Sequence, residues 1–249
     1  MSFYASFQGR VFLGERNAAG LPINLRSPGN VADLKLALKT DVIEKYETQT
    51  GQRSLDHRMI KQKGATAMLT IEEFTKENLA LAMYSHHTDT APSTVTDEVI
   101  AGPINVGERY LLAHQKVSAL QLRDSAGAPA TLIAGTHYIA EPDFGAIEFL
   151  DVAGFTLPLR ASYAFGATTS IGIFTRPLPE RFLRFEGINT AQNNAKVLVE
   201  LYRLAFDPLK ELSLISDEYN KFEIEGALLR DSSKPFDADL GQYGRIVQL

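Results

Sequence analysis

The chain has 249 residues, of which 45% are hydrophobic and 22% are charged, a balance typical of a soluble globular protein. Its formal net charge of −5 gives no overall attraction to nucleic acid or to an anionic membrane, so either partner would need a local patch. The sequence contains no cysteine, which excludes disulfides, cysteine nucleophiles and thiolate metal sites.

The N-terminal part alternates as β-strands do. MSFYASFQGR lacks the pattern of a secretion signal and no stretch approaches 18 apolar residues, so we expect neither export by that route nor membrane insertion.

Residues 7–15 predict a strand that turn residues 17–20 fold back toward 23–26. The next strand has one dry face and one solvated face. The dry positions are Leu34, Leu36, Leu38 and Val42, and the solvated ones are Lys35, Lys39, Asp41 and Lys45.

A polar stretch, YETQTGQRSLDHRMIKQK, runs from Tyr46 to Lys63 with almost nothing to bury. Two interpretations stay open: a mobile hairpin, and an arm that only a neighbouring subunit orders. Its mixed charges favour a polar contact over an apolar one. The candidate contact residues of this inter-ring arm are Tyr46, Glu47, Gln49, Gly51, Arg53, Asp56 and Arg58.

Residues 58–84 predict a long strand that runs directly into a short amphipathic helix. Thr75 is the expected N-cap, because its hydroxyl can accept from an amide of the first turn. A helix of about ten residues is marginal by itself in water, so its apolar face must pack against a sheet. The residues of that face are Leu79, Ala80, Met83 and Tyr84.

The composition changes between residues 92 and 175, which hold 8 of the 18 glycines. Short alternating runs are separated there by turn signals, and linker-like sequence flanks the segment at 85–92 and 176–179. We therefore expect a small all-β domain at 92–175, inserted into a domain made of residues 1–91 and 176–249.

The C-terminal part returns to β structure, with expected strands at 181–186, 196–206 and 221–229 and an edge strand at 244–249. The asparagines within 189–194 suit a turn, because Asn tolerates positive φ. The sequence thus predicts a mainly β (α+β) protein with one flanking helix.

The sequence offers no catalytic motif: GxSxG, HExxH, the P-loop and GxGxxG are all missing. Asp143-Phe144-Gly145 spells a kinase triplet without the other kinase motifs, which favours a turn. His86, His87 and Asp89 are too close in sequence to converge readily on a metal. We expect no catalytic residues, no cofactor and no metal site.

Three blocks carry a resemblance to a known family. They are FQGRVFLGERNAAGLP, LKLALKTDVIEKYETQTGQRSLDHRMIKQKGATAMLTIEEFTKENLALAMY and RFLRFEGINTAQNNAKVLVELYRLAFDPLKELSLISDEYNKFEIEGALLRD. Over roughly two thirds of the chain, this succession resembles the major tail tube protein of a long-tailed, siphovirus-like bacteriophage. The segment 92–175 resembles, less specifically, the extra β domain that some such proteins carry.

The resemblance implies a β-sandwich or barrel with one helix, with the inserted domain on the outside of a tube. It implies a structural virion protein, made in the host cytoplasm, whose hexameric rings stack into the hollow tail tube through which DNA is ejected. Its implied partners are copies of itself and other tail proteins, namely the tape measure, tail terminator and tail tip. DNA would pass without sequence-specific binding, and no membrane is implied.

An acidic channel wall would let DNA slide, because DNA carries one negative charge per roughly 1.7 Å of its axis. Screening limits the effect to about 8 Å at physiological salt. The alternative for these side chains is an ordinary outward-facing surface. The candidate lumen residues are Lys35, Lys39, Asp41, Glu200, Glu223 and Glu225.

Two other functions remain open. The tube protein of a contractile secretion-type machine would predict the same sheet and helix. A carbohydrate- or cell-binding β module would also be rich in strands, although such platforms commonly use stacking aromatics and this chain has no Trp.

Overall fold

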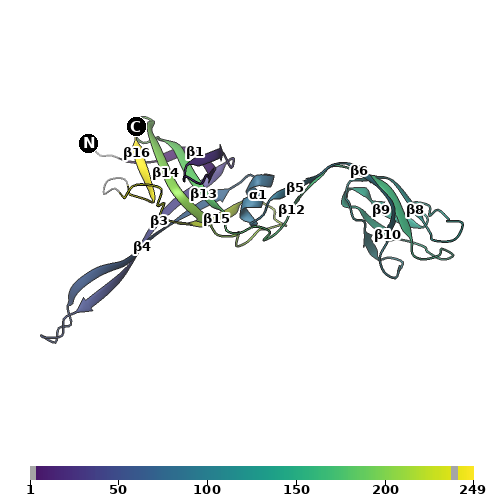
Figure 1. The fold of residues 1–249 in the computed structure, drawn as a ribbon, viewed down its shortest axis with the longest axis horizontal. Helices are drawn as coiled ribbons and strands as arrows, with labels where there is room; N and C mark the ends of the chain where they lie inside the picture. The colour runs from purple at the N-terminus through teal and green to yellow at the C-terminus, as the bar shows by residue number, and fades with distance from the viewer. Residues whose placement is uncertain (1–3, 237–240) are drawn as a thin grey trace. The chain divides into compact units, whose positions relative to one another are not determined.

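The computed structural model describes residues 4–236 and 241–249 (Figure 1). The chain forms two compact units: the body, from residues 1–86 and 171–249, and the insert, from residues 87–170. Strands make up 51% of the chain and helices 4%. The described residues therefore form a mainly β protein with one α-helix, as the alternation predicts.

The insert starts and ends five residues before the boundaries expected from composition, 92 and 175. The reason is a two-stranded pairing of β5 (His87–Thr90) with β12 (Thr168–Ile171). Part of the segment predicted as a linker is therefore a strand. The hydroxyl of Thr169 donates a 2.6 Å hydrogen bond to the Asp89 carboxylate across this pair.

The body contains one antiparallel sheet in the order β2-β1-β13-β14-β15-β4-β3, with β16 also paired to β14. The predicted C-terminal edge strand is confirmed, because β16 pairs with residues 197–201 of β14. The strands are β1 (Phe7–Arg16), β2 (Pro22–Arg26), β3 (Val31–Tyr46), β4 (Leu55–Ile71), β13 (Glu180–Asn189), β14 (Ala195–Phe206), β15 (Phe222–Leu228) and β16 (Gly244–Gln248).

The body's core lies on one face of this sheet. The period-2 pattern of β15 shows how it forms, since Phe222, Ile224 and Leu228 are buried while Glu223 between them is exposed. Apolar residues of the neighbouring strands complete the cluster. They include Leu69, Ile71, Leu183, Leu201, Leu204 and Phe206.

The helix α1 (Lys76–Ala82) begins as predicted, because the Thr75 hydroxyl accepts a 3.2 Å hydrogen bond from the Asn78 amide. Its buried face differs from the prediction, since Leu79, Met83 and Tyr84 are only half-buried. The amide side chain of Asn78 is satisfied by groups inside the body, which turns that side of the helix inward. The buried residues are Asn78, Ala80, Leu81 and Ala82.

The insert has two three-stranded sheets, β6-β11-β8 and β7-β10-β9, around a core that includes Leu122, Ile147, Phe149 and Leu159. The turn predicted at Asp143 forms as the 3-10 helix η1 (Pro142–Phe144), which ends at Gly145 with φ of 62°. The strands are β6 (Ser93–Val99), β7 (Arg109–Leu111), β8 (Val117–Arg123), β9 (Tyr138–Glu141), β10 (Ala146–Phe149) and β11 (Arg160–Phe165).

Candidate assembly surface

The β3–β4 hairpin extends beyond the other strands of the body (Figure 1). Its pairing continues from Val31 opposite Ile71 out to Tyr46 opposite Leu55. The stretch 46–63 is therefore mostly strand, and residues 47–54 form the tip. β4 begins at Leu55, three residues before the predicted start of the central strand, because ladder pairing with β3 satisfies its backbone groups.

The tip is organised by its own hydrogen bonds. The Glu47 carboxylate accepts from the amides of Gln49 (2.8 Å) and Thr50 (2.9 Å) and from the Thr50 hydroxyl (2.6 Å). These bonds, led by that of the Thr50 hydroxyl, lower the pKa of Glu47 to about 2. Gly51 supplies a φ of 77°, which other residues rarely adopt. A neighbouring subunit is thus not required to shape the tip.

The predicted arm residues are divided between strand and tip. Glu47, half-buried, is held by the bonds just described, and the other six are exposed. In the strands lie Tyr46, Asp56 and Arg58, and in the tip lie Glu47, Gln49, Gly51 and Arg53.

The dry face predicted for β3 is buried only near its start. Leu34 packs against the body's core, but Leu36 is exposed and Leu38 is 80% exposed. Farther out, Val42 pairs with Ile60 and Ile43 with Met59, which places apolar side chains on both faces of the hairpin. Beside its mixed charges, the predicted arm therefore also presents the exposed apolar side chains of Met59 and Ile60. Other described residues leave these apolar side chains of the hairpin exposed, and we call them the apolar stripe: Leu36, Leu38, Ile43, Met59 and Ile60.

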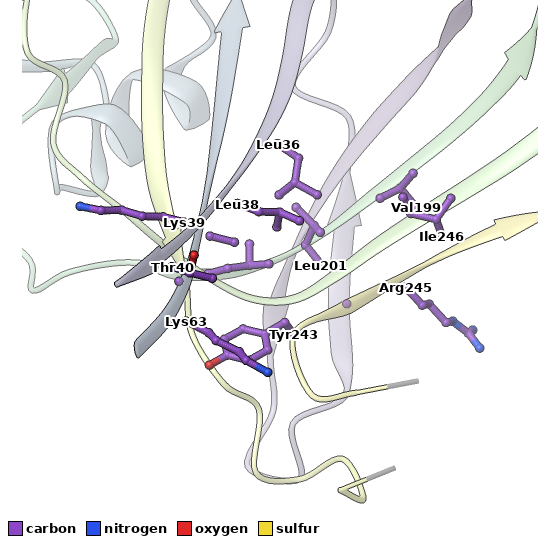
Figure 2. A pocket seen from close by; sticks show the side chains of 14 residues that line it. Leu36, Leu38, Lys39, Thr40, Lys63, Val199, Leu201, Tyr243, Arg245 and Ile246 are labelled. Carbon is purple, nitrogen blue, oxygen red and sulfur yellow. The ribbon is translucent and has the colours of Figure 1, made fainter. Parts of the chain in front are cut away.

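An apolar groove of about 390 Å³ lies where this stripe leaves the body, between β3–β4 and β14–β16 (Figure 2). Its buried wall includes Leu201 and Leu228, while Leu38 and Ile246 are exposed at its mouth. Lys63 joins them on the same face of the hairpin, because Thr40–Lys63 is the pair two positions beyond Leu38–Ala65. We call this the β3–β16 groove.

The opposite face of β15–β4–β3 carries most of the predicted lumen residues. Met68 of β4 has Glu225 on one side and Lys35 on the other, so these two charges share a row of the sheet. The hydrogen bond to Asp33, and its charge, raise the pKa of Lys35, with a smaller contribution from Glu223.

Two of the charges on this face are balanced locally. Lys35 forms an ion pair with Asp33, and the ammonium of Lys210 lies 2.8 Å from the Glu225 carboxylate. Lys39 and Asp41 lie farther along β3, opposite Gly64 and Gln62. Sequence spacing placed these charges on solvated faces, but only the register brings β3 and β15 charges together through β4.

Glu200, the remaining candidate lumen residue, is not on a solvated face, contrary to the expectation. It is only 8% exposed, because two arginines close over its carboxylate. Arg184 of β13 donates to it at 2.8 Å and Arg245 of β16 donates at 2.7 Å. Sequence reasoning missed this cluster, since its arginines lie 16 and 45 residues from Glu200 and only the strand order brings them there.

The remaining titratable candidates do not form a larger cluster. The imidazole Nε2 of His87 lies 4.0 Å from the Asp89 carboxylate. Among the described residues there is no group of three or more His, Cys, Asp or Glu side chains suited to hold a metal ion. Likewise, none of the described helices is long and apolar enough to cross a membrane.

Comparison with known proteins identifies a family for this chain. No curated protein matches the chain. A family model described as "Protein of unknown function UCP028589" matches residues 4–247, which is nearly the whole length, and the chain therefore belongs to that family.

Proposed function

We propose that this protein is a structural virion protein, the tail tube subunit of a long-tailed bacteriophage, which assembles into stacked rings around a channel for DNA. The observation that carries the proposal is the exposed apolar stripe on the β3–β4 hairpin. A stripe of this kind, rimmed by charged residues, marks a surface for another protein.

The open ends of the body's sheet support repeated self-association. Among the described strands, β2 and β3 each have one neighbour in the sheet, so each leaves one edge unpaired. An unpaired edge presents amide and carbonyl groups to which another chain can add. Because the two edges belong to different strands, contact between them would be heterologous, and heterologous contacts close into rings or continue as filaments.

The charged face of β15–β4–β3 is the candidate channel wall. The opposite charges cancel within the ion pair Lys35–Asp33 and within the ion pair Lys210–Glu225. Glu223 is exposed on the same face. A wall of this kind would not hold DNA by counterion release as a basic one would. In this proposal the lumen set is Lys35, Lys39, Asp41, Glu223 and Glu225, without Glu200.

The insert is proposed to face outward as an accessory module. It has its own core and its two ends run together as β5 and β12, so it is joined to the body through adjacent segments. Insertions of this form leave the host sheet uninterrupted.

Electron microscopy of the purified full chain tests the proposal. We expect rings or tubes whose abundance rises with protein concentration. Leu38→Asp should abolish them while preserving the folded body, because the side chain is already 80% exposed. The matched control is Leu111→Asp, which alters an exposed leucine of the insert. A chain that stays monomeric at every concentration, or that binds glycans as a monomer, would overturn the tube assignment.

A further inference from the structure

The loop between β14 and β15 contains an exposed segment that is both apolar and acidic. Residues 211–219, ELSLISDEY, form what we call the acidic loop. Leu214 is 83% exposed and Ile215 is 96% exposed. Three carboxylates accompany them without any basic residue, namely Glu211, Asp217 and Glu218.

The mouth of the β3–β16 groove has the opposite charge. Its lining includes the basic residues Lys63 and Arg245 and no acidic residue. Lys63 is among the residues that line the groove, as are Leu36 and Leu38 (Figure 2). The groove therefore combines an apolar wall with a basic border, and the acidic loop combines apolar side chains with carboxylates.

The acidic loop lies away from the groove of its own chain, since Lys210, Glu211 and Ser213 line a hollow with Met68 and Glu225 on the opposite face of the sheet. The loop enters β15 at Phe222, opposite Ile71 of β4, and the Leu209 amide near its start is fixed to the Ala82 carbonyl at 2.9 Å. The groove lies at the other end of β15, at Leu228. Six residues of extended strand separate the two ends by about 20 Å.

We propose that the acidic loop of one copy docks in the β3–β16 groove of the next copy. Leu214 and Ile215 enter the apolar part, and the loop's carboxylates face Lys63. This inference rests on the proposed self-assembly and names the two surfaces that meet. Loop and groove are different surfaces, so the contact is heterologous and each copy can both give a loop and receive one.

Engineered cysteines test the contact directly, because the chain has none of its own. One variant carries Leu38→Cys in the groove and a second carries Ile215→Cys in the loop. Mixed under oxidising conditions, they should form disulfide-linked heterodimers, whereas each alone should not. The matched control pairs Leu38→Cys with Ile133→Cys, an exposed position in the insert, and should give no heterodimer.

Charge exchange provides a second measurement on the same pair. In the cysteine variants, Lys63→Glu alone or Asp217→Lys alone should reduce cross-linking, and mixing the two should restore it. Restoration is not expected if either change merely perturbs folding. Failure of the exchange to restore cross-linking would overturn the assigned charge contact.

The outcomes separate this proposal from the tube assignment. Rings or tubes that form while the Leu38→Cys and Ile215→Cys variants give no heterodimer overturn loop docking and leave the tube standing. Homodimers of the Leu38→Cys variant would show that grooves face one another, which also overturns docking. A chain that neither assembles nor cross-links overturns both.

Discussion

The side-chain amide of Asn78 donates a 2.7 Å hydrogen bond to the carbonyl of Pro28, fifty residues earlier in the chain. Asn78 is 1% exposed, and its amide also donates to the Glu73 carbonyl at 2.9 Å and accepts from Arg26 at 2.9 Å. One polar side chain of α1 thus fixes the turn that precedes β3. The position of the hairpin therefore depends on this helix.

Replacing Asn78 by Ala should destabilise the body, because it leaves the Pro28 carbonyl and Arg26 without this partner. We expect a loss of about 1–3 kcal/mol in the free energy of unfolding, measured from urea titrations. The control Gln52→Ala, at the exposed hairpin tip, should stay within about 0.5 kcal/mol of the parent. An unchanged urea midpoint for Asn78→Ala would show that the helix is held by its apolar residues alone.

The insert should lose stability in acid through Asp124. Its carboxylate accepts from the amides of Thr156 (3.1 Å) and Ala130 (2.6 Å), and these bonds lower its pKa. Because the unfolded value is about 3.9, the stabilisation is present above that pH and is lost as pH falls through the lower, folded-state pKa.

The measurement is hydrogen exchange of peptides from the insert at pH 7 and under acid conditions. Asp124→Asn should raise exchange at pH 7 and should flatten the acid dependence. Asp143→Asn, which removes an exposed carboxylate of the same unit, should leave exchange at pH 7 unchanged. Equal acid sensitivity in the parent and Asp124→Asn would exclude this carboxylate as the cause.

Assembly should protect the outer part of the β3–β4 hairpin. Ile43 and Met59 form a cross-strand pair in which both side chains are exposed. In the neighbouring pair Ile60 is exposed and Val42 is half-buried. If another copy covers them, amides of residues 55–63 should exchange more slowly in the tube than in the monomer. Core residues of β15 serve as the internal control, since they are buried in both states. Equal exchange of 55–63 in the two states would contradict a role for the hairpin in assembly.

Removal of the insert should leave a folded body. Joining His86 to Ile171 through a short Gly/Ser linker deletes residues 87–170 and removes none of the body's core cluster. We expect a soluble product that still forms rings, seen by negative-stain microscopy. A soluble product without rings would assign the insert a part in assembly, and an insoluble one would show that the body needs it to fold.

Glu223→Lys should slow the passage of DNA without preventing assembly. The side chain is exposed, and in the proposed tube it faces the channel, where a new cation would attract phosphate. Ejection from virions should slow most at low salt, because salt screens the added charge. Glu148→Lys, on an exposed position of the insert, is the control. Ejection at the parental rate would move Glu223 off the channel wall.

The sequence by itself determined the features that depend on local chemistry. Thr75 caps α1 because a hydroxyl accepts from an amide three residues on, and Asn193 and Asn194 turn the chain because they tolerate positive φ, here 48° and 59°. The alternation of β15 placed Phe222 and Ile224 inside because side chains of a strand point alternately to two faces.

Tertiary structure decided what covers each face. Alternation puts Leu36 and Leu38 together but cannot say that the body stops short of them, since burial depends on strands distant in sequence. The sequence alone predicts that Glu200 is a solvated charge. It is buried because the order of β13, β14 and β16 brings Arg184 and Arg245 to its carboxylate. Periodicity found only part of the buried face of α1: Ala80 is buried as predicted, but the polar Asn78 is buried by partners that only the folded chain supplies.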